Sequence, residues 1–196
     1  MGKVRAVCIS EKRGTQKKNI ESAVFVENWG IEGDAHAGNW HRQISLLSEE
    51  TIAAFKARGA EVTDGAFGEN LVVSGYDFTK FPIGTRFTCK DVVLELTQIG
   101  KECHHGCEIF QKMGECIMPT NGVFAKVLHG GKISVGDEFH VQYRAAVITL
   151  SDTASKGERE DASGAAAEEI VGKEGYEVVF KKIIPDDGDT LTALLC

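Results

Sequence analysis

The sequence lacks any long apolar segment. None of its 196 residues belongs to a run that approaches the roughly 18 apolar residues needed to cross a bilayer. The first residues, MGKVRAVCISEKRG, contain neither an apolar stretch nor the small-residue cleavage site of a secretory signal. We therefore expect a cytoplasmic protein without a membrane partner. Thiols stay reduced in that compartment, which disfavours a structural disulfide.

An excess of positive charge is also missing. The formal net charge is −7. Residues 141–196 carry 6 basic and 11 acidic residues, whereas residues 1–140 carry 16 and 18. The sign reverses in the first twenty residues, which include Lys17 and Lys18. An acidic chain with one basic loop is not typical of a nucleic-acid binder. The loop suits one small anion, and a solvated lysine-rich loop is the alternative.

No internal repeat or low-complexity segment interrupts residues 1–142. Short apolar or alternating stretches are separated by glycine turns, and one helix is expected between the N-cap Ser48 and Gly59. This pattern predicts a mainly β fold, either a barrel or a sandwich, with few short helices. The expected strands are 4–10, 22–30, 43–47 and 67–75, a strand pair or one long bent strand in 85–100, and two strands in 122–142.

The pattern changes after Gln142. A continuous apolar strand at 144–152 is typical of a parallel sheet buried on both faces, and an alanine-rich helix is expected at 162–175. A second strand at 176–187 and a helix start at Asp187 complete a β-α-β-α order, as at the opening of a doubly wound α/β domain. About 55 residues cannot close such a sheet. We therefore predict one domain at 1–142 and a partial α/β segment at 143–196.

Cysteine and histidine crowd into residues 100–116, GKECHHGCEIFQKMGEC, which hold three of the six cysteines and two of the six histidines. Cys103 and Cys107 form one C-x-x-x-C pair of candidate metal ligands. Structural zinc sites usually add a second, distant pair. Here that pair would need Cys116 and a remote histidine. Zinc is therefore an alternative, but the spacing is unspecific.

A sulfur role is the second interpretation of this segment. Lys101 and His104 lie beside Cys103 in sequence, and nearby cationic groups lower the pKa of a thiol. A neighbouring thiol can also release a carried sulfur as a disulfide. The third interpretation, that cysteines here are small buried hydrophobes, accounts well for Cys8 and Cys89 in their apolar strand patterns but poorly for the cluster.

The glycine-rich loop at 30–43 supplies further candidates. Asp34, His36 and His41 could hold a hard metal, although their spacing matches no standard site, and they could equally satisfy the backbone of a long loop. Arg42 is the better functional candidate, because its planar guanidinium suits a phosphate or carboxylate.

Several of these motifs together resemble the MOSC domain, a name shared with the C-terminal domains of molybdenum cofactor sulfurases. The resemblance covers roughly residues 3–142 and is greatest to the small stand-alone bacterial type. The segments that carry it are GIEGDAHAGNWHRQISLLS, GAFGENLVVSG, FPIGTRF, LELTQIGKECHHGCEIF and GVFAKVLHGGKISVGDEF.

The resemblance implies a compact β-barrel that handles molybdopterin or its molybdenum form. One cysteine near the domain's end carries sulfur or ligates molybdenum in that family, and Cys103 occupies its place. We expect Cys103 to act as thiolate ligand or persulfide carrier, with Cys107 as a further candidate metal ligand. The residues expected to hold the cofactor are Arg42, Lys17, Lys18, Lys101 and His104.

The expected partners are proteins of molybdenum cofactor biosynthesis or molybdoenzymes, and a cysteine desulfurase. Pyridoxal phosphate is associated with the family through the desulfurases that serve some relatives. We expect none bound here, since no lysine lies in a recognisable Schiff-base motif. Two other functions stay open, namely a non-catalytic module that holds or delivers the cofactor and a zinc-stabilised structural domain.

The tail has its own resemblance. AAVITLSDTASKGEREDASGAAAEEIV is similar to the start of the Mog/MoaB-type molybdopterin-binding domain, which adenylylates molybdopterin with ATP and magnesium. The glycine-rich phosphate loop that lies further along in that family is absent. We therefore expect an incomplete domain at 143–196 without adenylyltransferase activity.

Overall fold

The computed structural model describes residues 2–102 and 108–196. The chain divides into two compact units, Met1–Val141 and Gln142–Cys196. No helix in the described part of the chain is both long enough and apolar enough to span a membrane.

The first unit is made mostly of short strands. Its helical segments are α1 (Glu49–Ala57), the 3₁₀ turn η1 (Phe78–Lys80), α2 (Glu108–Met113) and α3 (Met118–Asn121). Its strands are β1 (Gly2–Ile9), β2 (Lys18–Asn19), β3 (Ser22–Val26), β4 (Gly30–Ile31), β5 (Ile44–Ser48), β6 (Leu71–Ser74), β7 (Arg86–Cys89), β8 (Val92–Ile99), β9 (Val123–His129), β10 (Gly131–Ser134) and β11 (Glu138–Gln142).

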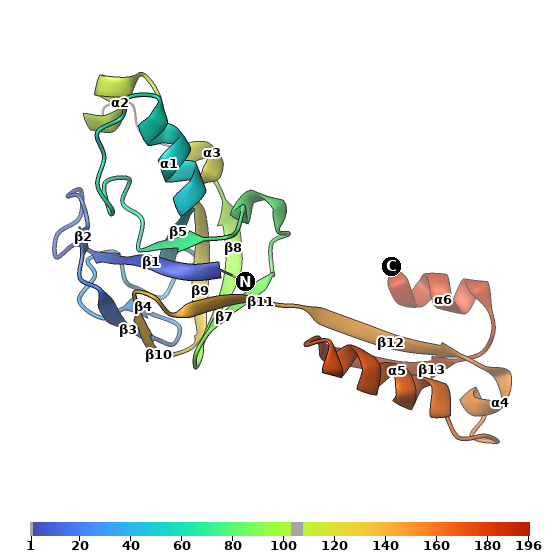
Figure 1. Cartoon of the computed structure of the whole chain (residues 1–196). Helices are drawn as coiled ribbons and strands as arrows, with labels where there is room; N and C mark the ends of the chain where they lie inside the picture. Colours follow the sequence, from blue (N-terminus) through green and yellow to red (C-terminus); the bar gives the residue numbers. More distant parts are fainter. Residues whose placement is uncertain (1, 103–107) are drawn as a thin grey trace. The chain divides into compact units, whose positions relative to one another are not determined.

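Seven of these strands close into a barrel (Figure 1). Their order is β11-β7-β8-β9-β5-β6-β1, and β11 pairs in turn with β1 through the register Gly2↔Phe139. Strands β5 and β6 run parallel, and α1 lies between them in sequence as the crossover helix. The predicted mainly β barrel with few short helices is confirmed.

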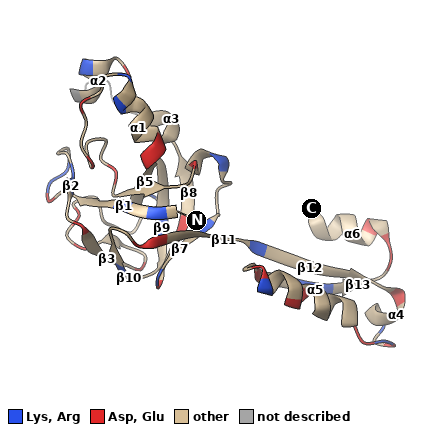
Figure 2. Cartoon of the chain, viewed as in Figure 1, with Lys and Arg blue, Asp and Glu red and all other residues tan. Residues whose placement is uncertain are grey.

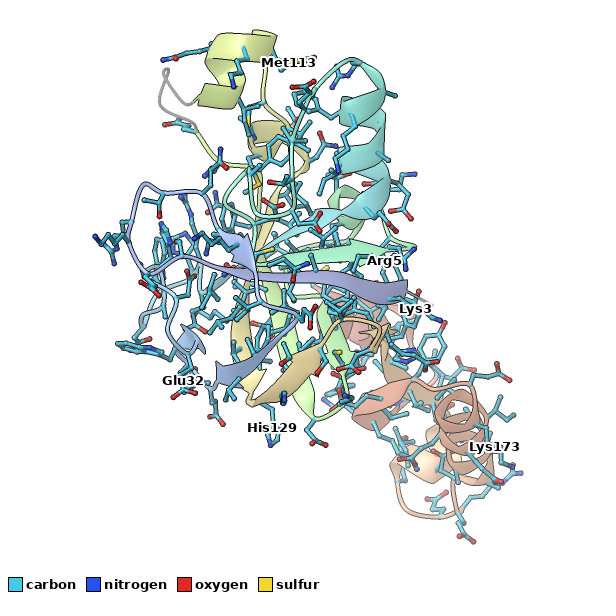
Figure 3. All side chains as sticks on the ribbon, turned by 60° about the vertical axis from the view of Figure 1, so that its left-hand side comes forward. Lys3, Arg5, Glu32, Met113, His129 and Lys173 are labelled. Carbon is cyan, nitrogen blue, oxygen red and sulfur yellow. The ribbon has the colours of Figure 1, made fainter. Side chains whose placement is uncertain are left out.

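Alternation along the strands decides what fills the barrel. In β1, Lys3 and Arg5 are exposed while Val4 between them is buried in the main core, and Figure 3 labels the two basic side chains on this strand. The core also holds a cluster of aromatic rings, in which Phe78 meets Phe87 edge-on with ring centroids 5.4 Å apart. Such edge-to-face pairs stabilise a core beyond the area that they bury.

One detail of the barrel differs from the sequence prediction, and one alternative that the prediction left open is resolved. Residues 122–142 form three strands rather than two, because the chain turns at Gly136 (φ +92°) as well as at Gly130 and Gly131. Residues 85–100 form the strand pair β7–β8 rather than one bent strand. The turn between them passes through Lys90 at φ +51°. This left-handed conformation is uncommon for lysine, so the sequence did not predict it.

The second unit has the predicted β-α-β-α order with one further short helix, α4 (Asp152–Ser155), in the segment after its first strand that was expected to be a loop. It comprises β12 (Arg144–Leu150), α4, α5 (Ala162–Lys173), β13 (Glu177–Ile184) and α6 (Gly188–Leu195). The two strands run parallel, and both contact α5. The prediction that 144–152 is buried on both faces was wrong. Only Val147 of β12 is buried, because a two-strand sheet offers its second face no cover.

Candidate functional site

A cavity of about 510 Å³ opens on the first unit. Four stretches that lie far apart in sequence form its walls, namely the loop before β2, the loop before β5, the loop before β6, and the chain around α2 and α3. Figure 2 shows basic residues on the first of these loops. The lining residues are Gly14, Thr15, Gln16, Lys17, His36, Trp40, Arg42, Ser45, Ala66, Phe67, Gly68, Asn70, Lys101, Ile109, Cys116, Met118 and Phe124.

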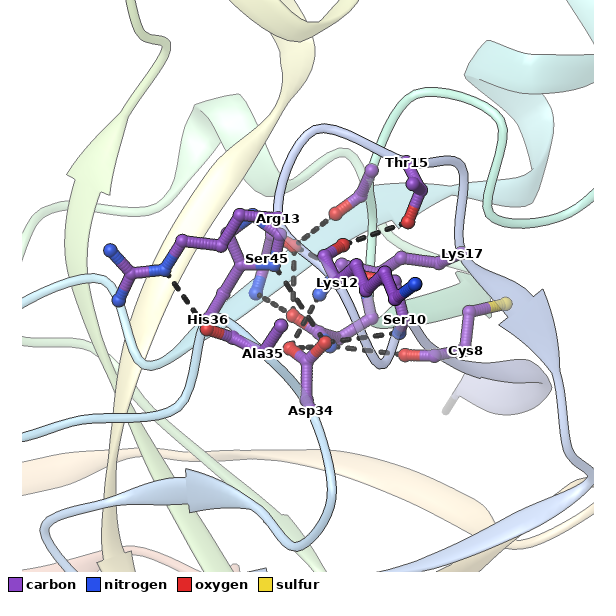
Figure 4. Close-up of polar contacts among 12 residues, drawn as sticks. Cys8, Ser10, Lys12, Arg13, Thr15, Lys17, Asp34, Ala35, His36 and Ser45 are labelled. Carbon is purple, nitrogen blue, oxygen red and sulfur yellow. Dashed lines mark hydrogen bonds and ion pairs between the residues drawn. The ribbon is translucent and has the colours of Figure 1, made fainter.

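Asp34 is the buried centre of the polar network beside this cavity (Figure 4). Its carboxylate accepts hydrogen bonds from Lys17 Nζ at 2.6 Å, from Asn70 Nδ2 at 3.0 Å and from the Ser10 backbone N–H at 3.1 Å. Burial alone would raise the pKa of Asp34, but the bonds from Lys17 and Asn70 outweigh it and lower the pKa below its ordinary value. The network therefore fixes the loops on both sides of the cavity.

Glu69 shapes the loop before β6, which forms part of the cavity wall. Its side chain is fully buried and accepts the backbone N–H groups of Gly65 at 2.6 Å and Phe67 at 3.0 Å. Burial raises the pKa of Glu69 to about 7, against the lowering effect of these bonds. Gly65 has φ +88°, and a Cβ there would lie 2.2 Å from the carbonyl oxygen of Lys17. Only glycine fits this close approach between the two loops.

Arg42 and Lys101 bring positive charge to the cavity. Arg42 Nε donates to Gln98 Oε1 at 2.9 Å, and its guanidinium lies 5.3 Å from the ring centroid of Phe124. Both contacts hold the half-buried guanidinium in place without cancelling its charge. Among residues 2–102 and 108–196, no carboxylate forms an ion pair with Arg42 or Lys101. The cavity is therefore suited to an anion.

The structure places some of the candidate residues from the sequence in this cavity and others elsewhere. Lys17, Arg42 and Lys101 line one cavity, although the ammonium of Lys17 is already bound by Asp34. Lys18 is exposed in β2 and borders a different, smaller pocket. The expectations for Cys103, His104 and Cys107 lie outside the described residues. Cys116, a lesser candidate on sequence grounds, lines the cavity.

The two strand cysteines behave as buried hydrophobes. Burial raises the pKa of Cys8 to about 12 and that of Cys89 to about 11, so neither is a thiolate at neutral pH.

The loop histidines do not assemble a metal site. No group of three or more His, Cys, Asp or Glu side chains suited to a metal occurs in the part of the chain that the structure describes. The oxygens of Asp34 are engaged by Lys17 and Asn70. His41 Nε2 lies 3.0 Å from Gln98 Oε1. These contacts satisfy Asp34 and His41, whereas the buried Nδ1 of His36 has no hydrogen-bond partner in the described chain.

Sequence reasoning missed Asp34, Glu69 and Asn70 as the framework of the site. The segment FGENL could have indicated this role. It places an acidic residue and an amide directly before an apolar strand, and buried polar side chains of this kind are usually hydrogen-bonded, often to backbone groups.

Several solved structures have a fold similar to that of much of this chain. The YuaD protein from Bacillus subtilis matches with a TM-score of 0.61 and 23% identity, over 72% of this chain and 96% of that one. YiiM from Geobacillus stearothermophilus matches with a TM-score of 0.56 and 16% identity, over 72% and 75%. At these identities the likeness is one of fold. No curated protein sequence matches. The sequence model of the MOSC domain covers residues 33–140, more than half of the chain. The chain belongs to the MOSC domain family.

Proposed function

We propose that the cavity of the first unit binds molybdopterin or its molybdenum form, and that the chain transfers sulfur in the maturation of that cofactor. Membership of the MOSC family supports the cofactor class, since this family is associated with molybdenum cofactor handling in general. The single observation that carries the proposal is the pair of cations, Arg42 and Lys101, that face one cavity without a carboxylate partner in the described chain.

The residues present fit such a ligand. A volume of about 510 Å³ lies within the range of small-molecule pockets. Arg42 offers a planar fork and Lys101 a point charge, which are the two usual partners of a phosphate. Trp40, Phe67 and Phe124 provide aromatic surface for a fused heterocycle.

Each element of the site has a part in this function. Arg42 and Lys101 would hold the phosphate, and Asp34 would keep the loops that carry Lys17 and Asn70 closed around the ligand. Cys103, two residues after Lys101 in sequence, would be the thiolate that carries sulfur as a persulfide or ligates molybdenum. When bound, the cofactor supplies a molybdenum centre that can receive sulfur.

Other members of the pathway follow from this proposal. A cytoplasmic cysteine desulfurase would load the sulfur, and a molybdoenzyme or another cofactor-biosynthesis protein would receive the product. Residues 143–196 would be the β-α-β-α opening of a Mog/MoaB-type domain, without adenylyltransferase activity in this chain.

A cofactor-delivery module is the second candidate function. It is favoured by the bonds that Lys17 and Asn70 make to Asp34, because they hold the loops around the cavity in a preformed binding geometry. Turnover separates the two functions. A sulfurtransferase releases sulfurated product repeatedly, whereas a delivery module binds one cofactor per chain and releases it unchanged.

Calorimetric titration of the whole chain with molybdopterin tests the proposal. Arg42→Ala and Lys101→Ala should each weaken binding by about 10-fold or more, because each removes a charge-assisted hydrogen bond worth roughly 1.5–3 kcal/mol. Lys18→Ala, a lysine outside the cavity, should leave the affinity unchanged. Equal affinities for all four proteins would contradict this site.

The sulfur role needs a separate measurement. After incubation with a cysteine desulfurase and cysteine, Cys103 should gain the mass of one sulfur atom in a peptide map. Cys103→Ser should bind the cofactor but transfer no sulfur. A chain that binds molybdopterin but acquires no sulfur on Cys103 would point to the delivery module.

A further inference from the structure

His36 holds an unusual position in the wall of the cavity. It lies two residues after Asp34 in the loop, and its side chain is 36% exposed. Its Nδ1 is buried and has no hydrogen-bond partner in the described chain. That atom lies 3.8 Å from Asp34 Oδ1, beyond hydrogen-bond length but close enough for a strong electrostatic interaction.

The arrangement selects one tautomer of the ring. The carboxylate of Asp34 is held in place by Lys17 and Asn70, and it can only accept hydrogens. A negative oxygen beside Nδ1 favours the tautomer whose proton is on Nδ1. Because Nδ1 is buried while the side chain as a whole is 36% exposed and lines the cavity, the exposed edge of the ring is the one that carries Nε2. Nε2 therefore presents a free lone pair to whatever enters.

The charges around the ring keep it neutral. Burial lowers the pKa of His36, and the positive charges of Lys17 and Arg13 lower it further, while Asp34 opposes them. Arg13 is held nearby by a hydrogen bond from its Nε to the carbonyl oxygen of Ala35. The imidazole is thus a base, rather than an acid, near neutral pH.

The cationic groups that line the cavity, and Glu69 beside it, cannot take this part. Lys17 donates to Asp34, and Arg42 and Lys101 are cations with no lone pair at neutral pH. Glu69 is fully buried and engaged by two backbone N–H groups. Among the described residues of the cavity wall, His36 is the one neutral nitrogen base.

We propose that His36, oriented by Asp34, is the proton acceptor of the cavity and deprotonates a thiol of the bound ligand. The proposal rests on the proposed function in sulfur chemistry, which needs a thiolate. The S–H bond breaks, its electron pair stays on sulfur, and the proton forms an N–H bond at Nε2. The carboxylate of Asp34 offsets part of the cost that burial, Lys17 and Arg13 impose on the resulting imidazolium. The ligand class is a small anion that carries a thiol, with the anionic group on Arg42 and Lys101.

Long-range ¹⁵N–¹H spectra of the whole labelled chain test the geometry without any ligand. His36→Gln assigns the signal, and His41 serves as the exposed reference. At pH 7 we expect a proton on Nδ1, none on Nε2, and a titration midpoint below the ordinary value of about 6.5. A proton on Nε2, or a midpoint above that of a free histidine, overturns the proposal.

Alkylation of a small probe tests the proton transfer. The probe is 2-sulfanylethyl phosphate, whose thiol reacts with iodoacetamide only as the thiolate, and the product is measured by mass spectrometry. The wild-type chain should accelerate this reaction saturably, by about 10-fold or more, with a rate that rises through the His36 midpoint. His36→Gln should bind the probe with unchanged affinity but lose the acceleration, and His41→Gln should keep both.

The outcomes distinguish this inference from the function on which it rests. If the acceleration depends on His36 but the chain does not bind molybdopterin, His36 is supported as the proton acceptor and the proposal of molybdopterin as the ligand is rejected. Molybdopterin binding without acceleration of the probe, or with equal acceleration in His36→Gln, rejects the proton acceptor alone.

Discussion

The two units of this chain use similar residues with opposite results. Both contain β-branched and aromatic side chains, but in the barrel Phe25, Phe87 and Phe139 are buried. In the second unit, Phe180 is 41% exposed and Tyr143 is 50% exposed. The second unit's buried apolar side chains are few: Val147, Ala154 and Ile184. Closure of the sheet, rather than composition, makes the difference.

A closed sheet covers its own inner face, and one helix is enough to cover part of the outer face. In the barrel, Ile52 and Phe55 of α1 join a second apolar cluster outside the main core. A two-strand sheet has no inside. Helix α5 covers one face of β12 and β13, and the other face keeps its apolar side chains in contact with solvent.

Cutting the chain between the units should have the largest effect on this contrast. We expect residues 1–142 to melt cooperatively, because they contain both apolar clusters and the closing β1–β11 pair. Residues 143–196 alone should be largely unfolded, since so small a buried core does not offset the entropy of ordering the chain. Circular dichroism during thermal unfolding of the two fragments is the measurement. A cooperative melt of the isolated tail would remove the contrast altogether.

Paired phenylalanine substitutions sharpen the comparison residue by residue. Phe87→Ala should destabilise the barrel by about 3–5 kcal/mol, because it opens a void among packed rings. Phe180→Ala, on the uncovered sheet face of the second unit, should change stability by about 0.5 kcal/mol or less. Urea unfolding of the whole chain gives both values. A large cost for Phe180→Ala would mean that something covers this face in solution.

The pH dependence of stability gives a third comparison. The pKa of Glu69 is about 7 in the folded barrel against an ordinary 4.5, so the folded state keeps a proton that the unfolded state has lost. Stability should therefore fall as pH rises from 4.5 to 7, at about 1.4 kcal/mol for each unit by which the pKa is raised. The lowered pKa of Asp34 acts only at lower pH, where its contribution is lost.

Glu69→Gln separates this effect from the rest of the chain. The variant cannot titrate, so the fall in urea-derived stability between pH 4.5 and 7 should flatten. In the second unit the capping residues Asp161 and Asp187 have lowered pKa values, caused by backbone and side-chain hydrogen bonds, and act in the opposite direction at lower pH. An unchanged slope in Glu69→Gln would assign the pH dependence to other groups.

Most of the fold could be predicted from the sequence, because alternation and capping are local signals. Ser48 accepts a hydrogen bond from the Thr51 backbone N–H at the start of α1, as its position predicts. The left-handed Lys90 could not be predicted, since nothing in its residue type favours φ +51°. The exposure of β12 could not be predicted from its local sequence pattern either, because the burial of a strand depends on how many other strands lie beside it.

The site was less accessible from the sequence. Arg42 and Lys101 were chosen for their charge, and the structure places both on one cavity, where their role stays a prediction. The burial of Lys17 against Asp34 could not be foreseen, because the two residues come from different loops and only the fold joins them. A sequence shows which residues are charged, but it does not show which of those charges are paired with an opposite charge in the fold.

Closure of the barrel through β1 and β11 has a consequence for synthesis. The strand made first pairs with the barrel strand made last, through Gly2↔Phe139. Until β11 has left the ribosome, β1 and β7 present unpaired strand edges to the surrounding solution. A nascent chain stalled before Phe139 is therefore the form most exposed to edge-to-edge aggregation. It is also the form to which we expect chaperones to bind most.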